Sequence, residues 1–144
     1  MIMRVIKNVI LVCLYLLFAA CAFTADEDLF DKIDNQPPQI VASQPADGWI
    51  QVPLGSTIRV WFSEPLDAAS VNQGNISLFS GEVTEVVAIN TTELEDGRGL
   101  LEVIPQRRLI PSVIYHLWIS KKVCDLYGNQ LPQAVWISFE TMNN

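Results

Sequence analysis

The fold of this chain is decided by residues 114–141, whose sequence is IYHLWISKKVCDLYGNQLPQAVWISFET. Two runs in it, residues 114–120 and 134–141, alternate in side-chain character with a period of two, which is typical of β-strands. Between them lie Asp, Gly, Asn and Pro, the residue types that form turns. The stretch therefore predicts an antiparallel hairpin centred near Tyr127-Gly128.

That centre fixes which side chains of the two strands face each other. On the outer side of the sheet it places Trp118 opposite Trp136, close enough for the indoles to touch. A register shifted by two residues would keep both tryptophans outward, as diagonal neighbours. If residues 76–80 border the hairpin, Phe79 joins a continuous aromatic strip with His116 at its edge. On the core side, the predicted pairs are Tyr115 with Phe139 and Leu117 with Ile137.

Five further runs show the same alternation and are separated by turn-forming residues. They are predicted as strands over residues 40–43, 56–62, 76–80, 83–89 and 100–104. Asp67 precedes Ala68-Ala69-Ser70 and is predicted to cap a single helical turn. About seven or eight short strands without long helices predict an all-β, immunoglobulin-like β-sandwich.

The predicted outer faces of the sheets carry more aromatic surface than a solvated face requires. Four large side chains point outward, namely Trp61, Phe79, Trp118 and Trp136. Rigid exposed aromatics are typical anchors of binding surfaces. We therefore predict a binding surface formed by the last three of these and His116. The alternatives are that the tether covers them, or that one strand faces the other way and its tryptophan belongs to the core.

The first 20 residues form a separate segment. Two basic residues precede an uncharged apolar run over residues 9–20, which is typical of a signal peptide and too short for a relaxed membrane-spanning helix. The run ends in Leu17-Phe18-Ala19-Ala20-Cys21, which resembles a bacterial lipobox. The resemblance implies that the Cys21 thiol receives a diacylglyceryl group and that cleavage leaves Cys21 at the N-terminus. Ordinary secretion through the neighbouring A-x-A pattern and an uncleaved anchor are the alternatives.

Lipidation would divide the chain into three parts. Residues 1–20 are the signal peptide, residues 21–37 the lipidated cysteine with an acidic tether, and residues 38–144 the globular domain. The residue after the cysteine is Ala22 rather than Asp, which by resemblance to enteric-type sorting implies the outer membrane. The acyl chains on Cys21, such as palmitate, would hold the protein on the membrane. No other cofactor is predicted.

The charge of the chain argues against nucleic acid as a partner. The formal net charge is −7, and without Arg4 and Lys7 of the leader, seven basic residues remain against 16 acidic ones, a net charge of −9. Binding to phosphates requires clustered cations. The basic residues that lie together are only the pairs Arg107-Arg108 and Lys121-Lys122.

Little in the sequence points to catalysis or to a metal. His116 is the only histidine, which excludes a three-histidine zinc site, and no serine or cysteine has an evident base. Calcium binding through Glu93, Glu95 and Asp96 is the alternative for their loop, and a solvated loop is the favoured explanation of these residues. Cys124 would have no partner once the lipid-acceptor cysteine is modified, so no internal disulfide is expected. The sequence predicts neither an enzyme nor a metal site.

Five motifs together resemble a known domain family. They are PPQIVASQPADG (37–48), IRVWFSEPLD (58–67), YHLWIS (115–120), DLYGN (125–129) and WISFET (136–141). In this order they resemble the bacterial Ig-like domain of the S-layer SbsA type. The resemblance implies a surface or envelope module of a kind often repeated in large proteins, present here once.

Part of the same sequence is also similar to copper-binding CopC-type domains. The similar residues are the opening SQPADG and the run FSEPL, at 43–48 and 62–66. Those domains use a histidine at the mature N-terminus and further histidines. This chain has Cys21 there and His116 alone elsewhere, so copper binding does not carry over.

Two classes of function follow from the sequence. The favoured one is a non-catalytic, lipid-anchored envelope module that docks onto another envelope protein. The alternative is a carbohydrate-binding module for wall or capsule glycans, with the outer aromatics as stacking platforms. Polar residues around a flat tryptophan pair would favour a glycan, whereas an apolar patch would favour a protein.

Overall fold

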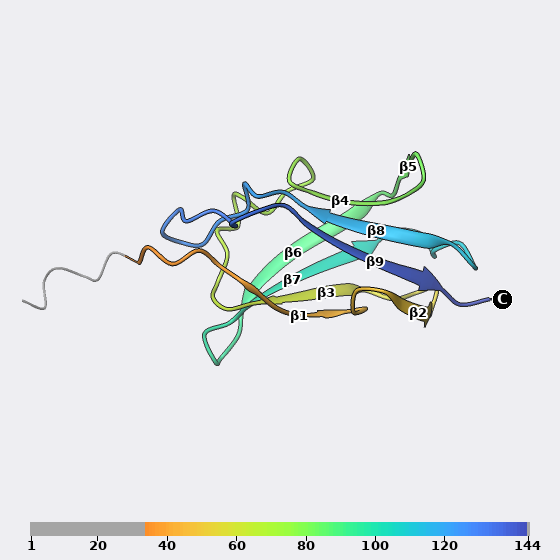
Figure 1. Ribbon diagram of the computed structural model, residues 1–144, viewed down its shortest axis with the longest axis horizontal. Coiled ribbons are helices and arrows are strands. Elements are labelled where there is room, and N and C mark those ends of the chain that lie inside the picture. The colour runs from red at the N-terminus through yellow and green to blue at the C-terminus, as the bar shows by residue number, and fades with distance from the viewer. Residues whose placement is uncertain (1–33, 144) are drawn as a thin grey trace, which may run out of the picture. The chain divides into compact units, whose positions relative to one another are not determined.

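The computed structural model describes residues 34–143, which form strands and turns without an α-helix (Figure 1). The predicted signal peptide, Cys21 and most of the predicted tether lie outside the described residues. Within the described part of the chain, no helix is long and apolar enough to cross a membrane.

The strands form two sheets that face each other as a sandwich (Figure 1). The four-stranded sheet has the order β1-β3-β7-β6 and the five-stranded sheet the order β2-β9-β8-β4-β5. Neighbouring strands run antiparallel, except that β2 runs parallel to β9. The strands are β1 Ile40–Gln44, β2 Trp49–Val52, β3 Ile58–Phe62, β4 Ile76–Ser80, β5 Val83–Thr84, β6 Val87–Glu93, β7 Gly99–Pro105, β8 Ile114–Ile119 and β9 Val135–Thr141. The predicted all-β sandwich is confirmed.

The core lies between the sheets and consists of the side chains that alternate inward. Tyr115, Phe62 and Phe139 are the largest of the fully buried ones. Tyr115 stacks on Phe139 with ring centroids 5.9 Å apart, and its hydroxyl accepts a hydrogen bond from the Ile110 amide. Burial raises the pKa of Tyr115 above its ordinary value. The inward positions expected from the alternation are buried, apart from Val135, which is half-buried.

The structure differs from the prediction at three elements. β2 was not predicted, because its four residues do not alternate and Gln51 has a left-handed backbone with φ of 61°. The single predicted strand 83–89 is two strands, since the chain turns over Glu85-Val86 to pass from one sheet to the other. The predicted helical turn after Asp67 is a hydrogen-bonded turn instead, in which the Asp67 carboxylate accepts from the Ala69 amide.

The N-terminal residues of the domain pack against a loop that is distant in sequence. The Asn129 side-chain amide donates to the Asp34 carbonyl at 2.9 Å, and Pro38 is buried. The last residues of the predicted tether are therefore part of the sandwich. The start of the described chain and the C-terminal end of β9 lie at opposite ends of the sandwich (Figure 1).

Candidate functional site

The outer face of the five-stranded sheet carries the predicted aromatic strip, which we define as Phe79, His116, Trp118 and Trp136. β8 and β9 pair in the expected register, with Trp118 opposite Trp136. β4 borders β8 on its other side and places Phe79 opposite His116. The predicted geometry of the hairpin and of its neighbour is thus confirmed.

The four rings of the aromatic strip are joined by a chain of three ring contacts. Phe79 reaches both His116, at a centroid distance of 5.6 Å, and Trp136, at 5.7 Å and edge-on. Trp118 and Trp136 lie 6.5 Å apart with their planes inclined by 54°. The strip is therefore continuous but stepped, because the ring planes do not share one orientation.

The aromatic strip is open to solvent and nearly free of charge. Trp136 is 57% exposed, and the other three rings are half-buried. Alternation places Ile114 and Glu140 on the same face, and Glu140 is the one Asp, Glu, Lys or Arg residue at the outward positions of β4, β8 and β9. Ile114 is 54% exposed. An uncharged, aromatic surface of this kind on a flat sheet is unusual for a fully solvated face.

Trp49 was not among the predicted site residues, and it lies on the edge strand beside this surface. Trp49 is 51% exposed and lies on β2, next to β9. It lines a hollow of about 180 Å³ together with Ile50, Ile114 and Glu140. It also lines a second hollow of about 240 Å³ on its other side, with Gln44, Gln51 and Arg59 among the lining residues. The signal available in the sequence was the pair of large apolar residues Trp49-Ile50 directly after Asp47-Gly48, residue types that form turns.

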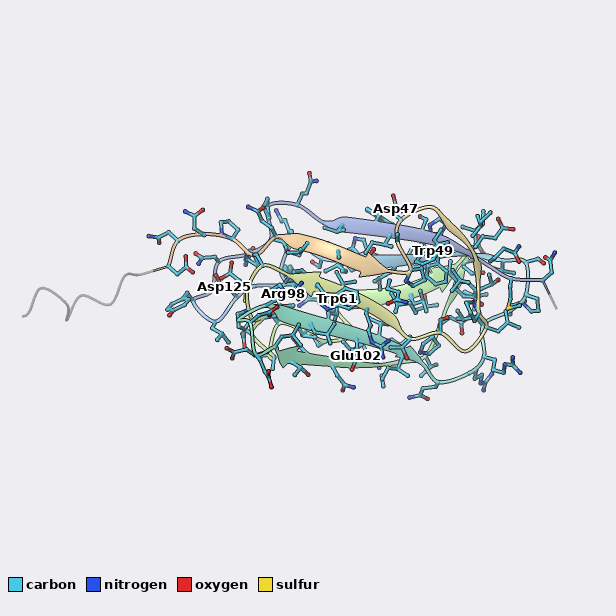
Figure 2. The ribbon with its side chains drawn as sticks, turned by 90° about the horizontal axis from the view of Figure 1, so that it is seen from below. Asp47, Trp49, Trp61, Arg98, Glu102 and Asp125 are labelled. Carbon is cyan, nitrogen blue, oxygen red and sulfur yellow. The ribbon has the colours of Figure 1, made fainter. Side chains whose placement is uncertain are left out.

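Trp61, the fourth outward aromatic of the prediction, lies on the other sheet. It is on β3, opposite Leu100 of β7 and half-buried (Figure 2). Near it on the same two strands, the Arg59 guanidinium donates to the Glu102 carboxylate at 2.9 Å. Trp61 therefore does not belong to the aromatic strip, and its face carries an ion pair.

His116 has one polar neighbour. Its Nδ1 lies 2.8 Å from Ser138 Oγ, at hydrogen-bonding distance. This serine–histidine contact was not predicted. A hydrolytic site also needs a group that orients the histidine and donors for an oxyanion. Among the described residues, no carboxylate accepts a hydrogen bond from this ring, so the contact by itself gives no catalytic arrangement.

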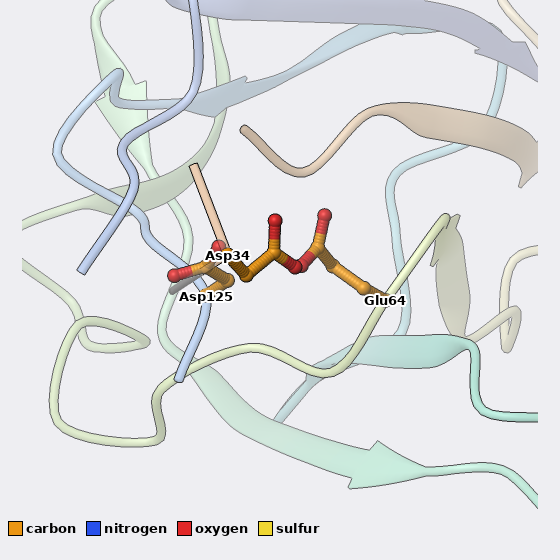
Figure 3. A group of neighbouring side chains, drawn as sticks. All are labelled: Asp34, Glu64 and Asp125. Atoms are coloured by element: carbon orange, nitrogen blue, oxygen red, sulfur yellow. The ribbon is translucent and has the colours of Figure 1, made fainter. Parts of the chain in front are cut away.

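Three carboxylates meet at the end of the sandwich where the described chain begins. Asp34, Glu64 and Asp125 come from three segments, and their oxygens lie within 4.8 Å of one another (Figure 3). We call this group the acidic corner. Asp125 is 1% exposed. Its carboxylate accepts hydrogen bonds from the Tyr127 amide, the Asn129 amide and the Asn129 side chain at 2.7–2.8 Å.

The two inner carboxyls of the acidic corner have opposite pKa shifts. The pKa of Glu64 is raised, first by burial and then by the negative charges of Asp125 and Asp34. Burial also raises the pKa of Asp125, but the hydrogen bonds donated by Asn129 and Tyr127 outweigh it and leave that pKa lowered. In the acidic corner the pKa of Asp125 therefore lies below its ordinary value, and that of Glu64 lies above it.

The residues weighed as a possible calcium site, Glu93, Glu95 and Asp96, do not form a cluster in the structure. Within residues 34–143, the acidic corner is the group of three acidic side chains close enough to share an ion, and Glu93, Glu95 and Asp96 are not among them. Asp96 instead pairs with Arg98, whose Nε lies 2.7 Å from its carboxylate. The pKa of Asp96 is lowered, first by the hydrogen bond from the Arg98 backbone amide and then by the one from the Arg98 side chain. Cys124 is a free, half-buried thiol.

Comparisons with known proteins agree with the fold. Residues 34–141 match the bacterial Ig-like domain family, and no curated protein matches the chain. The structure of the S-layer protein rSbsC(31-844) is similar with a TM-score of 0.51 and 18% identity, over 75% of this chain and 14% of that chain. The N-terminal part of the S-layer protein SbsC is similar with a TM-score of 0.51 and 16% identity, over 74% of this chain and 24% of that chain.

At this level of identity the two structures support the fold alone, and the chain corresponds to a small part of their length. The family match is broader, because it covers the whole sandwich from the acidic corner to the last strand. The chain belongs to the bacterial Ig-like domain family.

Proposed function

We propose that this protein is a non-catalytic, lipid-anchored module of the cell envelope that docks onto another envelope protein through the aromatic strip. The proposal includes lipidation at Cys21, an outer-membrane location and the SbsA-type resemblance. The tether would enter the sandwich at Asp34.

The observation that carries the proposal is the chemistry of the outer sheet face. Three aromatic rings and a histidine form one surface, with Ile114 beside it and Glu140 as the charged residue on those strands. Aromatic residues are enriched at the centres of protein interfaces, and charged residues are depleted there. The Trp136 indole, more than half exposed, is the natural anchor for a partner pocket.

The orientation of the rings favours a protein over an extended glycan chain. A glycan that stacks along a flat face needs aromatic planes of similar orientation. In the aromatic strip, Phe79 meets Trp136 at 88°, and the two indoles are inclined by 54°. A stepped surface fits the irregular side chains of a protein better than a row of sugar rings.

Carbohydrate binding is the second candidate, and a different feature favours it. The hollow of about 240 Å³ beside Trp49 combines an exposed indole with the side chains of Gln44, Gln51 and Arg59. Aromatic surface together with a few polar groups is typical of small-ligand sites. A glycan would therefore be expected at Trp49 rather than on the aromatic strip.

The docking proposal is tested by comparing two outward tryptophans on opposite sheets. Wild type, Trp136→Ala and Trp61→Ala would be used to capture partners from solubilised envelopes, and binding of the captured partner would then be measured with purified proteins. Trp136→Ala should abolish binding and Trp61→Ala should keep it. Equal binding by wild type and both variants would refute the role of the aromatic strip. Loss of binding to a purified wall glycan in Trp49→Ala alone would support the second candidate.

The anchor is tested separately by mass spectrometry of the mature N-terminus. We expect an acylated Cys21 with nothing before it, and a soluble or uncleaved form of the Cys21→Ala variant. An unmodified N-terminus at Phe23 would show ordinary secretion instead. This result would leave docking through the aromatic strip open, because the two parts of the proposal rest on different residues.

A further inference from the structure

The four edge strands of the sandwich differ in how well they could accept another strand. An edge strand exposes unpaired backbone groups, and proteins usually interrupt it. β1 has a register shift between Ile40 and Ala42, β5 is two residues long, and β2 has an irregular register at the left-handed Gln51. β6 is seven residues long and pairs with β7 without interruption over its whole length.

The hydrogen bonds at both ends of β6 show which of its backbone groups are free. Val86 accepts from the Gln106 amide at one end, and the Leu94 amide donates to Arg98 at the other. In an antiparallel pair, residues bonded to the neighbour alternate with residues that point away from it. Ile89 and Thr91 therefore direct both backbone groups to the open edge, and Val87 does the same, since its carbonyl accepts from the Gln73 side chain.

The side chains of β6 do little to block this edge. Its sequence is VAINTTE, without proline, lysine or arginine, and its one charge is Glu93 at the end. Ala88, Asn90 and Thr92 are exposed on the outer face. β-Branched residues without an inward charge are favourable for strand pairing.

We propose that β6 pairs antiparallel with β6 of a second copy of this chain, about a two-fold axis at Asn90. This register places Ile89 of each copy opposite Thr91 of the other, so the free groups of these residues make four hydrogen bonds. Each Glu93 then faces Val87 of the other copy rather than a second Glu93. A parallel pair in the same place would set the two Glu93 side chains beside each other. The self-complementary sequence thus favours a second copy as the occupant.

The contact is expected to be weak in dilute solution. Val87 is already bonded to Gln73 at the edge, so few hydrogen bonds form, and both copies are acidic. Confinement to one membrane surface raises the effective concentration and would allow pairing. The inference does not depend on the aromatic strip, which lies on the other sheet.

The test is disulfide trapping at two neighbouring positions of the same face. In the proposed pair the two Asn90 Cα atoms are about 4.5 Å apart, within disulfide range. The two Thr92 Cα atoms are separated by roughly 13 Å along the strands. Full-length N90C and T92C, each with Cys124→Ser, would be expressed in bacteria and their membranes oxidised.

N90C should give a product of twice the chain mass that reductant reverses, and T92C should give no more of it than the Cys124→Ser parent. Equal dimer in both variants would mean random collision, and no dimer in N90C would mean no pairing; either overturns the proposal. A product of another mass would identify a different occupant and also overturn it. Adding Thr91→Pro to N90C should abolish trapping, because it removes an outward amide and leaves the bonds to β7 in place.

Discussion

The DLYGN loop, residues 125–129, lies in the same hairpin as His116, Trp118 and Trp136 of the aromatic strip, yet the loop and the strip are built in opposite ways. In the loop, Asp125 is buried and its carboxylate accepts three hydrogen bonds from the turn that follows it. In the strip, Trp136 is mostly exposed, and its ring contacts are with other outward aromatics. The polar groups of the loop are hydrogen-bonded to one another, whereas the aromatic strip leaves apolar surface exposed to a partner.

The difference teaches that a prominent motif and a functional site are separate things. Asp, Gly and Asn at the loop are explained by turn geometry, since Gly128 has φ of 88° and Asp125 binds the turn amides. The exposed aromatics have no such internal explanation. Changes in the loop should therefore lower stability, and changes in the strip should lower binding.

The largest stability loss is expected for Asp125→Ala. The substitution leaves the amides of Tyr127 and Asn129 without their acceptor, and such a loss of buried, charge-assisted hydrogen bonds costs about 3 kcal/mol. The free energy of unfolding would be measured by urea denaturation. Asp96→Ala is the matched control, because Asp96 also accepts the amide two residues on but is exposed. If both substitutions have equal, small effects, the loop is not the structural element described above.

Substitution of the strip tryptophans should have a smaller effect on stability. Neither Trp118 nor Trp136 belongs to the buried core, and an exposed aromatic pair contributes about 1 kcal/mol. We expect Trp136→Ala to cost that or less, and Trp118→Ala somewhat more because it is half-buried. Thermal melting and partner binding would be measured on the same samples. A loss of several kcal/mol in either variant would identify a packing residue and break the contrast with the loop.

Features that depend on residues near one another in sequence were predictable, and features formed by distant segments were not. The hairpin register was predictable because alternation and the turn near Gly128 both constrain it. β2 was not, since its pairing with β9 joins segments far apart in sequence and Gln51 interrupts the alternation. Trp49 was missed for the same reason, because it lies on β2. The acidic corner was invisible for the same reason, because Asp34 and Glu64 meet Asp125 only through tertiary packing.

The smallest expected effect is a pH-dependent change in stability that arises at the acidic corner. The pKa of Glu64 is raised in the folded protein by burial and by the nearby Asp125 and Asp34. The folded state therefore holds the Glu64 proton more tightly than the unfolded state. The stability from this proton is fully present below the ordinary glutamate pKa of 4.5 and is lost as pH rises through the raised value. The opposite shift of Asp125 gives stability that is lost as pH falls through its lowered pKa.

Glu64→Gln removes the ionisation of Glu64 and keeps a side chain that can donate to Asp125. At pH 7 the variant should melt a few degrees above wild type, and the difference should shrink to nothing below about pH 4.5. Glu102→Gln is a suitable control, because Glu102 is half-buried but paired with Arg59, so this variant should not be stabilised at pH 7. A Glu64→Gln variant that melts below wild type at pH 7 would mean that the ionised carboxylate stabilises this corner. In that case the folded state would stabilise the ionised carboxylates of the acidic corner, as the DLYGN loop does for Asp125. The binding of an added cation at the corner would then be the next property to measure.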